Sequence, residues 1–114
     1  MRLFIRCVEG EVRLGPGKIE LLELIDTHGS ISEAARMMDM SYRRAWLLVA
    51  ELNQGFRQPV TTARTGGKGG GHATLTDFGH ELIRLYRKIE RDAAKAAAGP
   101  MEKLAKQLAV RAEG

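Results

Sequence analysis

The feature that most constrains this 114-residue chain is the segment 30–53, in which two short helical patterns are separated by a tight joint. Each pattern repeats apolar residues at the spacing of one helix face. These residues are Ile31, Ala35 and Met38 in the first pattern and Ala45, Val49 and Leu52 in the second. Two helices joined by a short turn are typical of a helix-turn-helix.

The joint between the two patterns contains residues suited to a sharp turn. Asp39 is one of the few residue types besides glycine that tolerate a left-handed backbone. Met40 can fill the angle between the helices, and Ser41 is a good N-cap for the second helix. The first helix has two candidate caps, since Ser30 begins a capping box and Ser32 matches the usual start of such a helix. We expect Ser32 to be the cap.

The second helix begins with Tyr42, Arg43 and Arg44. A recognition helix enters the major groove of DNA with its N-terminal residues at the base edges. Arginine can bind guanine bidentately, tyrosine can reach a phosphate or a base, and Leu47 can touch a thymine methyl. The alternative is a surface helix with two solvated arginines, but the helix-turn-helix pattern favours recognition. Together with Ser41, these residues form the expected DNA-contacting set.

The distribution of charge supports an anionic partner. The chain carries 18 Lys and Arg against 14 Asp and Glu, a formal charge of +4 and a pI of about 9.6. No acidic residue occurs between Glu51 and Asp77, an interval that contains Arg57, Arg64, Lys68 and His72. An acid-free basic interval beside a recognition helix is the electrostatic footprint of a nucleic-acid-binding protein. We therefore expect double-stranded DNA as the partner.

The same interval predicts a strand, a glycine-rich loop and a return strand over residues 59–64, 65–71 and 72–75, which describes a wing. The loop is not a Walker A nucleotide loop, because Thr62 stands where that motif needs glycine and Gly69 where it needs Ser or Thr. Either the loop is merely flexible or its bare backbone lies against DNA phosphates, and we favour the second. The expected contacts are Arg64, Thr65, Lys68 and His72.

Two segments precede the helix-turn-helix. Residues 2–14 alternate as an extended chain that Glu9-Gly10 can turn into a two-stranded ribbon. Such a ribbon is marginal alone, so it is expected to lie on the rest of the fold or on a partner subunit. A helix then begins near Pro16, and Gly29 is the natural residue to end it.

A long helix is expected after Thr76, its N-cap. Its two adjoining apolar stripes can face the chain's own domain and a second subunit together, and the alternative is that both are core. We favour dimerisation because one winged helix offers a small DNA interface. The expected dimer contacts are Phe78, Leu82, Leu85, Tyr86 and Ile89. The helix is expected to stop at Gly99-Pro100, with a short amphipathic helix over 101–108.

Other classes of protein are disfavoured by what the sequence lacks. The single cysteine, Cys7, allows no intramolecular disulfide, and three scattered histidines without a Cys-x-x-Cys pair argue against structural zinc. No nucleophile with an adjacent base, no carboxylate pair and no metal-ligand set can be assembled, so we expect neither an enzyme nor a cofactor. Without a signal-peptide pattern or a membrane span, the protein is expected to be cytoplasmic.

Residues 30–46, the glycine-rich loop and the motif Leu75-Thr76-x-x-Gly79 together resemble the DNA-binding domain of ModE-type molybdenum-responsive regulators. The helix-turn-helix is also similar to that of LysR-type regulators. The resemblance covers roughly residues 2–90 and implies a dimeric winged helix-turn-helix. It implies that the first turn of the recognition helix faces DNA, that the loop around Lys68 contacts the backbone, and that Trp46 packs between this helix and neighbouring structure.

The chain departs from the family pattern in the turn and the wing. Asp39 stands where glycine is common, His72 stands where the loop usually continues with glycine, and Thr61 and Thr62 replace a more typical acidic residue. Full-length ModE proteins also carry C-terminal molybdate-binding domains, which we expect this chain to lack, so control by molybdate does not follow from the resemblance.

The leading hypothesis is a homodimeric, sequence-specific DNA-binding transcriptional regulator whose small-molecule effector is unknown. Residues 1–90 would form the winged domain with its N-terminal β segment, and residues 91–114 a helical extension. The alternative is a small-oxyanion (molybdate-type) binding protein in which the glycine-loop amides, Lys68 and Arg64 hold the anion. A protein-interaction adapter is a third possibility, which the basic wing disfavours.

Overall fold

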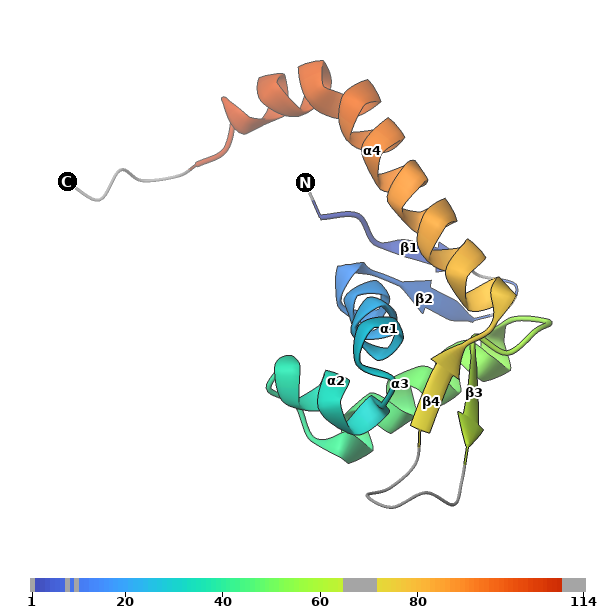
Figure 1. Cartoon of the computed structure of the whole chain (residues 1–114). Coiled ribbons are helices and arrows are strands. Elements are labelled where there is room, and N and C mark those ends of the chain that lie inside the picture. The colour runs from blue at the N-terminus through green and yellow to red at the C-terminus, as the bar shows by residue number, and fades with distance from the viewer. Residues whose placement is uncertain (1, 8, 10, 65–71, 110–114) are drawn as a thin grey trace.

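The computed structural model describes residues 2–7, 9, 11–64 and 72–109. In chain order they form β1 (Ile5–Cys7), β2 (Val12–Leu14), α1 (Pro16–His28), α2 (Ile31–Met37), α3 (Tyr42–Gly55), β3 (Thr61–Arg64), β4 (His72–Leu75) and α4 (Asp77–Ala105). Figure 1 shows α1, α2 and α3 grouped in one body, the β3–β4 hairpin beside it, and α4 extending past β1 and β2. The predicted class, a mainly helical winged helix-turn-helix with a long last helix, is confirmed.

The centre of the core is α1. Its residues Ile19, Leu21, Leu22 and Ile25 have no exposed surface, and α2, α3, β4 and α4 all contact this helix. Full burial of one such side chain is worth about 1.5–3 kcal/mol relative to leaving it in water. The packing of the other helices around α1 therefore holds the helix-turn-helix in place.

The first helix of the helix-turn-helix begins two residues earlier than a Ser32 cap would require. The Ser30 hydroxyl accepts a hydrogen bond from the Glu33 N–H at 2.9 Å, and α2 starts at Ile31. The expectation of a Ser32 cap is therefore wrong. Gly29 ends α1 in the left-handed region at φ 73°, and Ser30 follows directly in the extended conformation that an N-cap adopts.

The joint between α2 and α3 has the predicted construction. Asp39 has a φ of 54°, in the left-handed region. Met40 is half-buried and packs against the core. The Ser41 hydroxyl accepts a hydrogen bond from the Arg44 N–H at 3.1 Å, so its prediction as the N-cap of α3 is confirmed.

Both predicted hairpins are present. In the wing, β3 and β4 are antiparallel, and their register pairs Thr61 with Leu75 and Arg64 with His72. The return strand has its predicted bounds, whereas the first strand begins two residues later than expected. At the N-terminus, β1 and β2 pair and lie on the chain's own core, because Val12 is buried and the Tyr86 hydroxyl donates to the Leu3 carbonyl.

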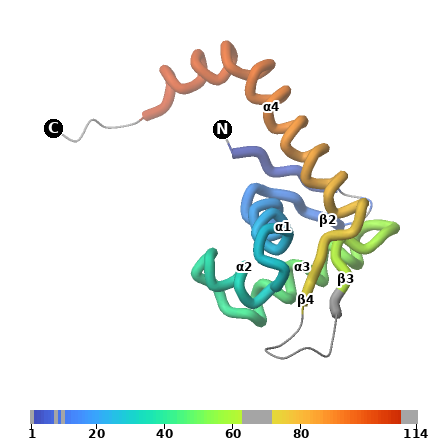
Figure 2. The backbone as a smooth tube through the Cα atoms, viewed as in Figure 1, coloured from blue at the N-terminus to red at the C-terminus, as the bar shows by residue number. Residues whose placement is uncertain are grey.

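The last helix is longer than predicted. Thr76 is its N-cap as expected, accepting a hydrogen bond from the Gly79 N–H at 3.0 Å. The expected stop at Gly99-Pro100 is wrong, since α4 continues through Pro100 to Ala105. A proline removes one backbone hydrogen bond and bends a helix rather than always ending it. Figure 2 shows the last part of α4 curving away from the line of its first part. The proposed boundary after residue 90 lies within this helix.

Candidate nucleic-acid interface

The residues predicted to read DNA lie together on one exposed surface. Ala45, Val49 and Leu52 are buried and fix the orientation of α3 about its axis. With that face inside, the N-terminal turns of the helix project their other side chains into solvent. The predicted members Ser41, Tyr42, Arg43, Arg44 and Leu47 are all exposed, with Tyr42 at 56% and Leu47 at 44%.

A shallow hollow of about 290 Å³ follows the same helix face, lined by Ser41, Arg43, Arg44, Leu47, Leu48 and Glu51. It combines two guanidinium groups with two leucine side chains, a mixture that suits base edges and thymine methyls. Among the described residues, no ion pair involves Arg43 or Arg44. Their donors are therefore open to a ligand rather than held by the chain's own carboxylates.

Trp46 is placed differently from the expectation. The resemblance implied that it packs between the recognition helix and neighbouring structure, but 51% of its surface is exposed, so this prediction is wrong. The reason is its position on the helix, since residues i and i+4 share a face and the partner four residues before it is the exposed Tyr42. The two aromatic side chains thus lie on one exposed helix face beside the arginines.

The wing is attached to α3 by a residue that the sequence reasoning missed. The Asn53 side-chain oxygen accepts hydrogen bonds from the N–H of Val60 at 2.7 Å and of Thr61 at 3.4 Å, and its amide donates to the Thr61 hydroxyl at 3.3 Å. Asn53 lies seven residues after Trp46 and shares its helix face. The face that carries Trp46 therefore turns toward the wing. The sequence signal that could have identified this residue is an asparagine on the polar side of a helix, a few residues before a strand.

Only part of the predicted wing set can be located. His72 is exposed at the start of β4, directly across the hairpin from the backbone of Arg64. The predicted contacts Thr65 and Lys68 lie outside the described residues, as does the side chain of Arg64. The described part of the wing is its base, which leads from the end of α3 toward the start of α4.

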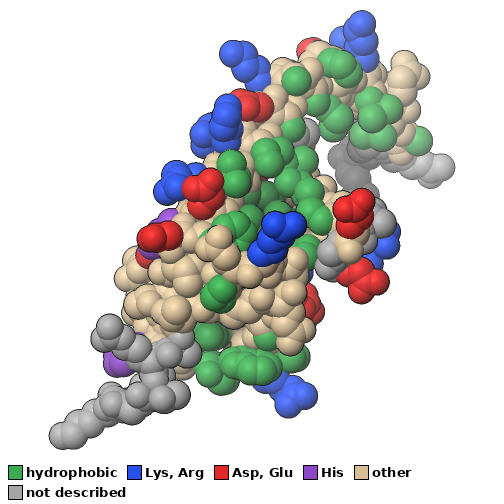
Figure 3. Space-filling model, turned by 90° about the vertical axis from the view of Figure 1, so that its right-hand side faces the viewer, with side chains coloured by type: hydrophobic (Ala, Val, Ile, Leu, Met, Phe, Trp, Pro, Cys, Tyr) green, Lys and Arg blue, Asp and Glu red, His purple; other side chains and the backbone are tan. Residues whose placement is uncertain are grey.

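The residues predicted to form a dimer divide into two groups. Leu82 and Tyr86 are 4% and 1% exposed, because they fill the chain's own core, and Phe78 is half-buried against Phe56. Leu85 and Ile89 are 47% and 45% exposed. Figure 3 shows hydrophobic side chains on one face of the molecule, from its body toward its upper end. Further exposed apolar residues of the C-terminal region are Met101, Leu104 and Leu108.

A polar cluster joins α4 to α1 beside this apolar stripe. The Arg87 guanidinium donates to the Glu23 carboxylate at 2.7 and 3.3 Å and to Glu90 at 2.9 Å. These hydrogen bonds, chiefly that to Glu23, hold the pKa of Arg87 above its ordinary value. A second bridge between the same helices joins His80 and Asp26 at 2.9 Å. The start of α4 is thereby fixed relative to the helix-turn-helix.

In the part of the chain that the structure describes, no group of three or more His, Cys, Asp and Glu side chains could hold a metal ion. None of the described helices is both long and apolar enough to cross a membrane.

The fold and its exposed helix face define the winged helix-turn-helix class. No family profile matches the chain. Comparison with curated proteins shows that the chain is a homologue of the N-terminal region of the ModE regulators and of the Mop molybdenum-pterin-binding proteins. The predicted resemblance to ModE-type regulators is therefore confirmed.

Three relatives illustrate this similarity. The molybdenum-pterin-binding protein MopB of Rhodobacter capsulatus is 44% identical over 96 residues, which cover 79% of this chain and 36% of MopB. The DNA-binding transcriptional dual regulator ModE of Escherichia coli K12 is 42% identical over 81 residues, 71% of this chain and 31% of that protein. The molybdenum transport protein ModE of Azotobacter vinelandii is 36% identical over 77 residues, 68% of this chain and 28% of that protein. The chain thus matches about a third of each relative's length.

Proposed function

We propose that this chain is the sequence-specific DNA-binding part of a homodimeric transcriptional regulator. The observation that carries the proposal is the exposed cluster of Tyr42, Arg43 and Arg44 at the N-terminal turn of a helix whose opposite face is buried in a winged fold. The similarity to a DNA-binding regulator of Escherichia coli points in the same direction.

In this proposal α3 lies in the major groove and the wing lies over the adjacent backbone. Arg43 and Arg44 donate hydrogen bonds to guanine O6 and N7, the contacts that discriminate between base pairs. Lys68, in the wing, contacts phosphates and adds affinity without adding specificity. Asn53 keeps the wing and the recognition helix in one fixed relation, since its side chain joins α3 to the first residues of the wing.

Homodimerisation through α4 completes the proposal. A second copy of this chain would cover the exposed stripe that contains Leu85 and Ile89, which the core leaves free. Two winged domains joined in this way would read the two halves of a pseudo-palindrome about one DNA turn apart. Replacing Leu85 by Glu should shift the sedimentation profile from dimer to monomer, and the exposed control Ala98→Glu should not.

The direct test is binding of the purified protein to its own upstream DNA and to a scrambled duplex, measured by fluorescence anisotropy at two salt concentrations. Each lost bidentate contact should reduce the preference for the correct base by about 5- to 150-fold, equivalent to about 1–3 kcal/mol. Arg43→Ala and Arg44→Ala should therefore lose specificity, while Lys68→Ala should weaken binding to both duplexes alike. Full operator affinity in the double arginine variant would contradict the assignment of α3 as the recognition helix.

The alternative function is binding of a small oxyanion. It is suggested by the similarity to MopB, whose name describes a molybdenum-pterin-binding protein. It would use the glycine-rich loop with Lys68 and Arg64. Calorimetric titration of the purified chain with molybdate, tungstate and sulfate tests it. Heat of binding that disappears in Lys68→Ala would support the oxyanion function, and an absence of heat would end it.

A further inference from the structure

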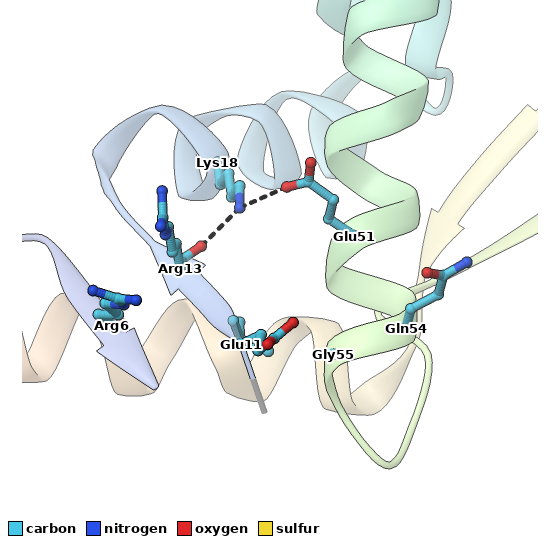
Figure 4. Close-up of a pocket in the computed structure, with 8 residues that line it drawn as sticks. Arg6, Glu11, Arg13, Lys18, Glu51, Gln54 and Gly55 are labelled. Atoms are coloured by element: carbon cyan, nitrogen blue, oxygen red, sulfur yellow. Dashed lines mark hydrogen bonds and ion pairs between the residues drawn. The ribbon is translucent and has the colours of Figure 1, made fainter. Parts of the chain in front are cut away.

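A polar pocket with a volume of about 700 Å³ lies between the N-terminal hairpin, the start of α1 and the end of α3 (Figure 4). Five charged side chains line it: Arg6, Arg13, Lys18, Glu11 and Glu51. Three are cationic and two are acidic, so the pocket carries one net positive charge. Neither the predicted recognition residues nor the predicted wing residues belong to it.

Internal contacts account for one cation and one acid of this set. The Lys18 ammonium pairs with the Glu51 carboxylate at 3.0 Å and donates to the Arg13 carbonyl at 2.8 Å. Figure 4 shows Lys18 bridging these two groups. The two hairpin arginines remain, and in the described part of the chain neither takes part in an ion pair.

These two arginines are held opposite each other by the hairpin. The register of β1 and β2 pairs Arg6 directly with Arg13, and both side chains are exposed. Like charges directly opposite on paired strands destabilise a hairpin. The pair therefore does not stabilise the fold, and an anion bound between the two guanidinium groups would remove their repulsion. Phosphate suits this geometry because guanidinium groups bind its oxygens in a bidentate manner.

The position of the hairpin on α3 indicates where such a phosphate would come from. Glu51 lines both this pocket and the hollow that contains Arg43 and Arg44. Asn53, which holds the wing, is two residues further along, about 200° around the helix axis. The hairpin and the wing therefore flank nearly opposite sides of the recognition helix. A helix in the major groove, about 12 Å wide, has a phosphate backbone on each of these sides.

We propose that Arg6 and Arg13 form a second backbone contact, which binds a DNA phosphate on the side of the recognition helix opposite the wing. This inference rests on the proposed DNA binding. The two sides have separate tasks, because phosphate contacts position the protein on the duplex without reading its sequence. The hairpin, the wing and α3 together would hold both backbones that border one groove.

The test is the salt dependence of duplex binding by Arg6→Gln/Arg13→Gln. The matched control is Arg91→Gln/Lys95→Gln, which removes the same charge from two exposed positions of α4. Each lost phosphate contact makes the negative slope of log K against log salt shallower by about 0.9. If two contacts are lost, the wild type binds more tightly than the hairpin variant at 50 mM salt, and this advantage in affinity should become about tenfold smaller at 200 mM salt. The preference for operator over scrambled DNA should not change.

Thermal melting supplies the second measurement, since the hairpin variant should melt at or above the wild-type temperature once the repulsion is removed. The inference would be overturned if the hairpin variant kept the wild-type salt slope, or if the slope of the control variant became shallower by the same amount. Either result would leave the proposed function intact. If inorganic phosphate stabilised only the wild type and duplex binding were equal in both, the pair would bind free phosphate and the DNA contact would be refuted. Failure of the wild type to bind any duplex would refute both proposals.

Discussion

Gly79 lies where the last helix meets the base of the wing, and its replacement by alanine should have a measurable cost. A Cβ atom there would overlap the Val60 carbonyl oxygen and lie 3.3 Å from the Leu75 Cβ. The carbonyl cannot easily move, because it accepts a hydrogen bond from the Thr76 N–H at 3.0 Å. Overpacking of this kind costs about 1–3 kcal/mol, and the higher helix propensity of alanine offsets up to about 1 kcal/mol. Because the clash is with a fixed backbone atom, its cost should lie in the upper part of this range, so the net loss should be about 1–2 kcal/mol.

For a chain of 114 residues, this loss corresponds to a fall in melting temperature of about 4–8 °C. Circular dichroism melting and urea titration of Gly79→Ala measure it. Gly17→Ala is the matched control, because it lies in α1 with nothing within 4 Å of the added Cβ, and it should melt at or slightly above the wild-type temperature. If Gly79→Ala melted no lower than the wild type, the close packing of α4 on the wing base would be refuted.

Three further predictions concern single side chains. Trp46 is the only tryptophan and is 51% exposed, so acrylamide quenching of its fluorescence should fall when duplex is added; unchanged quenching would place the duplex elsewhere. Tyr86→Phe should lower the free energy of unfolding by about 1 kcal/mol, because the hydroxyl donates to the Leu3 carbonyl. Burial, and secondarily Glu90, raises the pKa of Tyr86 above 10.0, so its contribution is complete below pH 10 and declines as the pH rises through the raised pKa. Melts from about pH 8 to 11 should show a smaller alkaline loss in the variant. Asn53→Ala should cost about 1–3 kcal/mol, since it leaves the Val60 N–H without its acceptor, and a urea curve equal to that of the wild type would contradict this role.

Helix ends were the most predictable features, because each depends on a few consecutive residues. The left-handed Gly29, the left-handed Asp39 and the caps Ser41 and Thr76 all follow from local backbone and hydrogen-bonding preferences. The same reasoning chose the wrong cap for α2, since two serines both fit locally. The choice depended on how closely the left-handed Gly29 brings the end of α1 to the start of α2.

Features that depend on distant segments were predicted poorly. The burial of Leu82 and Tyr86 and the exposure of Leu85 and Ile89 follow from how α4 lies on α1. Helical periodicity showed a wide apolar surface but contained no information about which part of it the core would use. The continuation of α4 through Pro100 was also missed, because the cost of one lost hydrogen bond has to be weighed against the helix on both sides of it.

The helix-turn-helix, the wing hairpin, the outward arginines of the recognition helix and the relationship to ModE-type regulators could all be derived from the amino-acid sequence. These depend on spacing and residue type within short segments, where local preferences agree with one another. Three relations are visible only in the folded chain: Asn53 joins the recognition helix to the wing, Trp46 is exposed, and Arg6 and Arg13 lie opposite each other in a hairpin beside α3. Those relations join residues far apart in the chain or on facing surfaces, and packing alone determines which of them meet.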